Sequence, residues 1–326
     1  MHDSWDSDYD SDSSSHSPSE SSFDEEEVNQ RIFPFWPRYR TLIRSRGFHL
    51  DTVRDVRDFY DECRRLGQTP RPIPAGIDKE RGDDALCPDE GLPANLFRGT
   101  RVSDGKKIVL KAVHIASREY DIIRALSRGP LREDPRNHTI PVVDLVEFAI
   151  DRIAFIVMEE WSSQLITDDG PCCLSLFFAA IRQCIEHAVF MHSLKMAHLD
   201  ISLRNLVTDY NGRYAYIDFE LARRFDDDPN PRLVHRRGTE VPPECERGEA
   251  TDPYKIDVWA LGVLILRACK LTGYYVPELM HVVKPMLNDR PEGRPSSLAV
   301  LRAFDKMVPL IDEERLQMVC RAGASH

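Results

Sequence analysis

The chain has 326 residues, 42 % of them hydrophobic, which is enough for one large domain or two smaller ones with a packed core. Its formal net charge is −11, but the first 28 residues hold ten of the 54 acidic residues and no Lys or Arg. The remaining chain therefore has 43 basic against 44 acidic residues, and this balance excludes the basic footprint of a nucleic-acid-binding domain.

Cysteine usage and the amino terminus indicate an intracellular protein, in cytoplasm or nucleus. The eight cysteines show no C-x-x-C pairing and no His–Cys arrangement typical of zinc, and five of them lie in or beside apolar stretches. This usage is typical of a reducing compartment. The acidic amino terminus is not a signal peptide, and the nine-residue apolar run at Val258–Leu266 is too short to span a bilayer. We therefore expect neither a membrane nor a nucleic acid as partner.

Two segments precede the first regular pattern of strands. Residues 1–28 contain ten serines among the ten acids, so we expect a disordered acidic tail, which is either phosphorylated or only solubilising. Residues 29–90 are expected to form a helical extension and a linker. Aromatic residues precede a helix expected at 52–66, and several Pro and Gly follow it.

Strand patterns begin near residue 96. A Ser-Asp-Gly turn between two apolar, β-branched runs predicts a β-hairpin, and a helix and two further strands follow. Strands are expected at 96–102 and 107–113, a helix at 116–128, and two further strands at 142–150 and 153–158. Four strands are thus expected, with the helix after the second.

The second half of the chain is rich in helical patterns. A long apolar helix is expected over Leu174–Leu194, and Asn211-Gly212 predicts a type I′ turn between two short strands. The charged, Pro-containing stretch Asp226–Arg237 is expected to be a mobile loop. Further helices are expected at 258–269, 277–287 and 297–307.

The stretch between the long helix and the hairpin carries the chemistry. Asp200 follows His198 and Leu199, Asn205 comes five residues later, and Asp218 begins an Asp-Phe-Glu sequence thirteen residues further on. A base, an amide and a carboxylate on loops beside a strand pair suit phosphoryl transfer from a metal–nucleotide complex. The spacing resembles the H-R-D-x-x-x-x-N and D-F-G pattern of protein kinases.

Other motifs extend this resemblance over about residues 90–310. Pro242-Pro243-Glu244 resembles A-P-E, residues 257–262 resemble D-x-W-x-x-G, and Arg294-Pro295-Ser296 resembles R-P-[ST]. In the family the glutamate and arginine of these motifs form a buried ion pair. The chain is identified as a divergent protein-kinase-like domain. The strings at 101–105, 109–111 and 134–138 resemble kinase-like families expanded in mushroom-forming fungi.

The resemblance implies an α+β fold with two lobes. A small, mainly antiparallel β lobe with one key helix would occupy residues 91–161, and a larger α-rich lobe would occupy residues 162–315. A C-terminal tail, 316–326, would follow. The oligomeric state is left open.

The resemblance also implies roles for individual side chains. Asp200 would be the base or orienter for the acceptor hydroxyl, and Asn205 and Asp218 would bind Mg²⁺ through hard oxygen atoms. A pair between Lys111 and Glu119 would hold the α- and β-phosphates of ATP. Further site residues would be Arg204 in the catalytic loop, Val109 and Val207 around adenine, and backbone groups of Glu159 and Trp161 at the hinge. His198 and Phe219 are expected to pack the two loops together.

Three departures from the family pattern keep three functions open. No G-x-G-x-x-G precedes Leu96, Leu199 replaces the usual Arg, and Glu220 replaces the Gly of D-F-G. The sequence favours an ATP- and Mg²⁺-dependent kinase acting on protein hydroxyls. The missing loop and Glu220 favour a catalytically weak or inactive pseudokinase that acts as a binding or scaffold protein. The Asp-Phe-Glu sequence also resembles aminoglycoside- and choline-kinase-like enzymes, so a small-molecule kinase is the third hypothesis.

Overall fold

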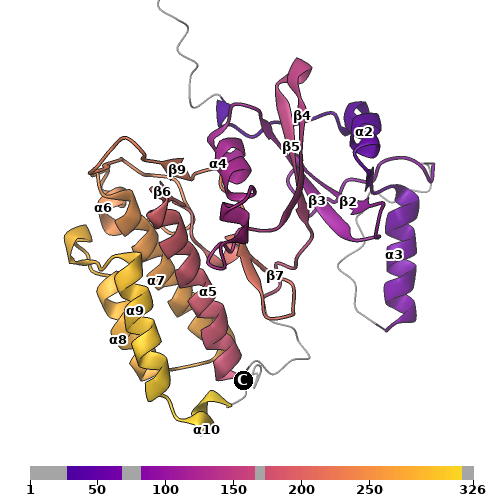
Figure 1. Cartoon of the computed structure of the whole chain (residues 1–326). Helices are drawn as coiled ribbons and strands as arrows, with labels where there is room; N and C mark the ends of the chain where they lie inside the picture. The colour runs from indigo at the N-terminus through magenta and orange to yellow at the C-terminus, as the bar shows by residue number, and fades with distance from the viewer. Residues whose placement is uncertain (1–27, 68–81, 166–172, 318–326) are drawn as a thin grey trace, which may run out of the picture.

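The computed structural model describes residues 28–67, 82–165 and 173–317, which form a β-rich lobe and a helical lobe (Figure 1). Residues 1–27 of the acidic tail expected at 1–28, and residues 318–326 of the C-terminal tail expected at 316–326, lie outside the described residues. Val28 is described and buried, so the expected tail does not include it. The two-lobed α+β arrangement expected from the sequence is confirmed.

The β-rich lobe is built on one antiparallel sheet of five strands. Its strands are β1 (Phe48–Leu50), β2 (Leu96–Arg101), β3 (Lys107–His114), β4 (Val142–Phe148) and β5 (Ile153–Glu159). They lie in the order β1-β2-β3-β5-β4. Helix α4 (Arg118–Leu126) follows β3 as expected, and the Ser117 hydroxyl caps its first turn by accepting a hydrogen bond from the N–H of Tyr120.

The expectation of four strands is wrong, because β1 adds a fifth from the segment expected to be a helical extension. Its three residues pair with β2, with Leu50 opposite Gly99. A strand of three residues has too few positions to show an alternating pattern, and this is the reason that the sequence did not reveal it.

Helices α2 (Trp36–Ser45) and α3 (Val53–Arg65) precede and follow β1 on the side of the sheet away from the helical lobe (Figure 1). The Trp36 ring lies 5.1 Å from that of Phe97 and 5.5 Å from that of Phe155, so α2 shares a hydrophobic core with the sheet. Helix α3 begins at a capping box formed by Thr52 and Asp55, close to its expected start.

The helical lobe packs its long helices side by side (Figure 1). The helices are α5 (Leu174–Ser193), α6 (Pro243–Glu246), α7 (Pro253–Thr272), α8 (Pro277–Met286), α9 (Ser297–Met307) and α10 (Glu313–Leu316). Helix α7 begins five residues before its expected start, because the Asp252 side chain caps it and Pro253 occupies its first turn. Among the described residues, helix α5 is long and apolar enough to cross a membrane. Most of its apolar stretch is, however, buried inside the protein, as in a core helix.

A short hairpin leads from the helical lobe to the junction of the lobes. Its strands are β7 (Leu206–Thr208) and β8 (Tyr214–Tyr216). The expected type I′ turn is wrong: five residues connect the strands, and the positive φ angles fall at Tyr210 and Gly212. The Asp209 carboxylate accepts hydrogen bonds from two N–H groups of this loop, which accounts for the longer connection.

Candidate functional site

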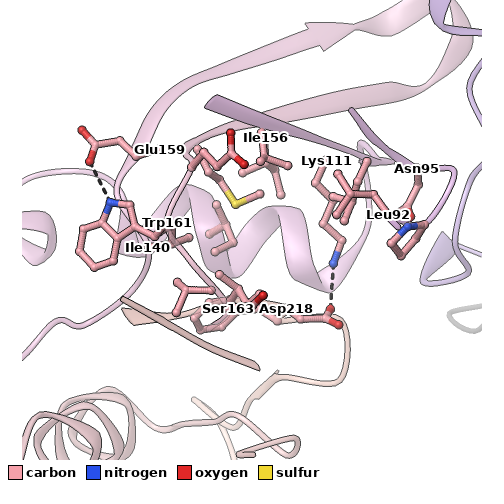
Figure 2. A pocket seen from close by; sticks show the side chains of 18 of the residues that line it. Leu92, Asn95, Lys111, Ile140, Ile156, Glu159, Trp161, Ser163 and Asp218 are labelled. Carbon is pink, nitrogen blue, oxygen red and sulfur yellow. Dashed lines mark hydrogen bonds and ion pairs between the residues drawn. The ribbon is translucent and has the colours of Figure 1, made fainter. Parts of the chain in front are cut away.

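A cavity of about 190 Å³ lies where the two lobes meet. Figure 2 shows Glu159 and Trp161 at one end of it, and Lys111 and Asp218 at the other. Its lining comes from both lobes and is largely apolar in the middle. The apolar side chains include Val109, Ile140, Ile156, Met158, Val207 and Ile217. Its lining suits a ligand with an apolar part and a charged end.

The charged end is organised by Lys111, in the middle of strand β3. Its Nζ donates to Oε1 of Glu119 at 2.7 Å and to Oδ1 of Asp218 at 2.8 Å. Glu119 lies in the first turn of α4, whereas Asp218 follows β8 in the other lobe. The structure therefore brings together three predicted site residues from three elements.

Charge balance explains why this ammonium can be buried. Burial alone would lower the pKa of Lys111, but Glu119 and Asp218 outweigh burial, and the pKa is raised. Burial likewise opposes ionisation of Asp218, yet the Lys111 ammonium, with a smaller contribution from Arg31, holds the pKa of Asp218 below its ordinary value. Both groups are therefore charged at neutral pH.

Asp200 and Asn205 lie together on the loop after α5. The Asn205 side-chain Nδ2 donates to Oδ2 of Asp200 at 2.8 Å and to its backbone oxygen at 2.9 Å. The backbone N–H of Thr239 donates to Oδ1 of Asp200 at 2.6 Å. These bonds hold the Asp200 carboxylate in one orientation near Asp218, since both residues line a second pocket.

Asn205 and the residue before Asp218 pair through their backbones at the open end of the hairpin. The N–H of Ile217 donates to the backbone oxygen of Asn205 at 3.0 Å, which extends the β7–β8 pairing by one step. Asp218 then adopts a left-handed backbone conformation, with φ of 63°. One carboxylate and one amide oxygen fit a hard divalent cation that takes its other ligands from phosphates and water. Among the described residues, no group of three or more His, Cys, Asp or Glu side chains could hold a metal by itself.

The predicted adenine residues line the other end of the cavity. Val109 and Val207 come from opposite lobes, and Glu159 and Trp161 lie where β5 ends. The Trp161 indole Nε1 donates to Oε2 of Glu159 at 3.1 Å. The N–H of Glu160 donates to the Lys107 oxygen at 3.1 Å, which ties this connection to β3.

Arg204 does not join the other predicted site residues. It is exposed and lines a groove with Leu203 and Leu271 on the helical lobe. His198 and Phe219 pack as expected, with ring centroids 4.8 Å apart.

Two residues had no role at the site assigned from the sequence, although Asp257 begins the D-x-W-x-x-G-like motif. Asp257, buried on α7, accepts hydrogen bonds at 2.8 Å from the N–H groups of His198 and Leu199 and so holds the loop before Asp200. An acidic residue in an otherwise apolar helix was the signal for such a role. Arg31 reaches the site from the segment before α2, and its Nε donates to Oε2 of Glu220 at 2.9 Å. No sequence pattern marks Arg31.

The amino-acid sequence matches known protein kinases. The family model described as protein kinase domain matches residues 94–278, more than half of the chain. The serine/threonine-protein kinase PAK 1 of Mus musculus is 21 % identical over 207 residues, which cover 62 % of this chain and 35 % of that protein. The CBL-interacting serine/threonine-protein kinase 16 of Arabidopsis thaliana is 29 % identical over 196 residues, which cover 53 % of this chain and 40 % of that protein. The matched regions thus span less than half the length of these curated relatives.

Proposed function

The chain belongs to the protein kinase domain family, and on that premise we propose that it transfers the terminal phosphoryl group of ATP to a protein hydroxyl. The observation that carries the proposal is the buried contact of Lys111 with Glu119 and Asp218, which links the β lobe to the helical lobe. If Lys111 pointed to solvent, it could not bind phosphates beside Asp218, and phosphoryl transfer would have no support. Positioning and fixed charge supply most of the catalysis in this chemistry.

Asp200 is the proposed base or orienter. Asn205 and the N–H of Thr239 hold its carboxylate, so an acceptor hydroxyl beside it would donate its proton to a preset oxygen. Asn205 and Asp218 are the proposed ligands of the divalent cation, Mg²⁺ by the hardness of their oxygens. When bound, that cation neutralises charge on the phosphates. Lys111 binds the α- and β-phosphates in this proposal.

The base of the nucleotide is proposed to lie between Val109 and Val207, against the backbone of Glu159 and Trp161. The relatives named above are serine/threonine-protein kinases, which supports a protein as the acceptor. We further propose that the protein acts in the cytoplasm or nucleus and that its partners are neither nucleic acids nor membranes. Kinship with the families expanded in mushroom-forming fungi stays a prediction.

A binding or scaffold protein on the same fold is the second candidate. Glu220 places a carboxylate after Asp218-Phe219, and Arg31 bridges to it at the mouth of the site. A small-molecule kinase is the third candidate, suggested by the Asp-Phe-Glu sequence. The buried pair of Arg294 with Glu244 and the anchoring by Asp257 belong to the motifs that weigh against it.

The replacement Asp200→Asn tests the proposal. It preserves the size of the side chain but removes the base, so we expect phosphate transfer to a generic protein acceptor to fall about 100-fold or more. Thermal denaturation with Mg·ATP should still show stabilisation, because a ligand that binds the folded state raises its stability. Asp228→Asn, on an exposed loop, is the matched control and should transfer phosphate like the wild type.

The same two measurements separate the candidates. A wild-type chain that Mg·ATP does not stabilise would contradict the kinase and favour the scaffold. Stabilisation with transfer only to small alcohols would favour the small-molecule kinase.

A further inference from the structure

Arg31 connects the start of the described chain to the centre of the site. Its Nε donates to Oε2 of Glu220 at 2.9 Å, and its Nη2 lies 3.9 Å from Oδ2 of Asp218. The two partners lie about 190 positions away in the sequence, and the Arg31 side chain is 49 % exposed. Part of the guanidinium therefore faces the opening of the site.

Contacts on both sides of Arg31 hold its segment in place. On one side Val28 is buried, and the Asn29 side-chain oxygen accepts a hydrogen bond at 2.8 Å from the N–H of Arg118, where α4 begins. On the other side Trp36 anchors α2, with its indole Nε1 donating to the Ala94 oxygen at 3.0 Å. Arg31 is thus positioned by the β lobe and reaches down to the helical lobe.

The surroundings of Arg31 indicate what it can bind. It lines the interlobe cavity together with Lys111 and Asp218. It also lines the adjoining pocket, which is lined by Asp200 and Arg237 as well. Arg31 therefore lies between the phosphate end of the cavity and the proposed base, which is where the transferred phosphoryl group would have to lie.

We propose that Arg31 binds the β- and γ-phosphates of the nucleotide with the part of its guanidinium that Glu220 does not hold. This inference rests on the proposed function. A guanidinium presents several N–H donors in a rigid fork, so Nε can keep its carboxylate while the Nη atoms bind phosphate oxygens. Glu220 then orients the arginine, and the chain supplies from its N-terminal segment a phosphate contact where no glycine-rich loop precedes Leu96.

A simpler role for Arg31 must be distinguished from this one. Arg31 could serve only to neutralise Glu220, so that its loss would harm nucleotide binding by exposing phosphates to an unpaired carboxylate. Removing both charges separates the two roles. The double variant Arg31→Met with Glu220→Gln would bind ATP like the wild type if neutralisation were the whole role, but weakly if Arg31 contacts phosphate.

The experiment is calorimetric titration of the full chain with Mg·ATP and, separately, with adenosine. We expect Arg31→Met to weaken Mg·ATP about 10- to 100-fold, the effect of one charge-assisted hydrogen-bonded contact, and to leave adenosine affinity unchanged. Arg31→Lys should recover part of the loss, and the double variant should stay weak. Arg46→Met is the matched control, because Arg46 is 50 % exposed and paired with Asp144 far from the cavity.

The outcomes distinguish a failure of the proposed role of Arg31 from a failure of the proposed kinase function. If the wild type binds both ligands and Arg31→Met binds Mg·ATP equally well, or if the double variant recovers wild-type affinity, the role of Arg31 is overturned and the proposed function stands. If the wild type binds neither ligand, the proposed function is overturned together with the inference that rests on it. Melting of each variant without nucleotide checks that the fold is retained.

Discussion

Lys111 is a charged side chain in the middle of a sheet, and two carboxylates decide where its ammonium lies. An ammonium buried without partners would cost several kcal/mol, which a nearby carboxylate offsets. The pairing with Glu119, eight residues along, follows from the resemblance of the spaced motifs to those of protein kinases. The contact with Asp218, 107 residues away, depends on the packing of the two lobes.

His187 shows the opposite case, a titratable ring held neutral by burial. It is fully buried and stacks on Tyr216 with ring centroids 4.8 Å apart. Its Nδ1 accepts a hydrogen bond from the N–H of His138 at 3.2 Å. Burial, and then the charge of neighbouring His198, lower the pKa of His187 well below its ordinary value of 6.5.

This depressed pKa predicts a loss of stability in mild acid. Below about pH 6.5 His187 becomes protonated in the unfolded chain but stays neutral in the folded chain. The contribution of the neutral ring to the free energy of unfolding is therefore fully present above that pH and is lost as the pH falls. His187→Asn keeps an acceptor for the His138 N–H but does not titrate. We expect its free energy of unfolding in urea to fall less steeply from pH 6.5 to about pH 5 than that of the wild type.

The control for this measurement is His281→Asn, whose ring is exposed. Equal slopes for wild type and His187→Asn would contradict the assignment.

At the scale of elements, strand β1 depends on a close approach of two backbones. A Cβ added at Gly99 would lie 2.5 Å from the carbonyl oxygen of His49 in β1, a distance that side chains do not adopt. Glycine is therefore required there by the neighbouring strand.

Gly99→Ala tests this dependence. We expect the pairing of β1 with β2 to be pushed apart and the free energy of unfolding to fall by about 1–3 kcal/mol, as in other overpacked sites. Urea denaturation measures the loss. Gly82→Ala is the matched control, since a Cβ there meets nothing within 4 Å. A Gly99→Ala protein as stable as the control would show that β1 is not held by this contact.

Helix α7 determines the shape of the loop that carries Asp200. Its Asp257 side chain is fully buried and accepts hydrogen bonds from two backbone N–H groups of that loop and from the His192 ring at 3.0 Å. Leu199 adopts φ of 63°, a left-handed conformation uncommon for leucine. The helix therefore supports the strained backbone just before the proposed base.

At the scale of the whole molecule, one buried ion pair connects helix α6 to the turn before helix α9. Both guanidinium Nη atoms of Arg294 donate to the Glu244 carboxylate at 2.7 Å, and both side chains are almost completely inaccessible to solvent. The ion pair predicted from the A-P-E-like and R-P-S motifs is thus confirmed. It joins α6 to the turn before α9, 50 residues apart.

Glu244→Gln should therefore destabilise the protein strongly. It leaves the Arg294 charge buried without a counter-charge, at a cost of about 3–5 kcal/mol in the free energy of unfolding. The double variant Glu244→Gln with Arg294→Met should recover part of that loss, because no unpaired charge remains. Urea denaturation of both variants checks this, with Glu249→Gln at an exposed pair as the control. A single variant no less stable than the control would rule out a structural role for the pair.

The sequence by itself determined the two-lobed fold class, the order of the main elements and the residues at both ends of the cavity. The order of the elements follows from local periodicity and turn chemistry, whereas the fold class and the site residues follow from the resemblance of spaced motifs to those of protein kinases. It did not determine the strand β1, the place of Arg204, or the approach of Arg31 to Glu220. Those features depend on which surfaces meet after folding: α2 on the sheet, the N-terminal segment on α4, and one lobe on the other. Contacts between residues far apart in the chain have no local pattern, so only the tertiary structure decided them.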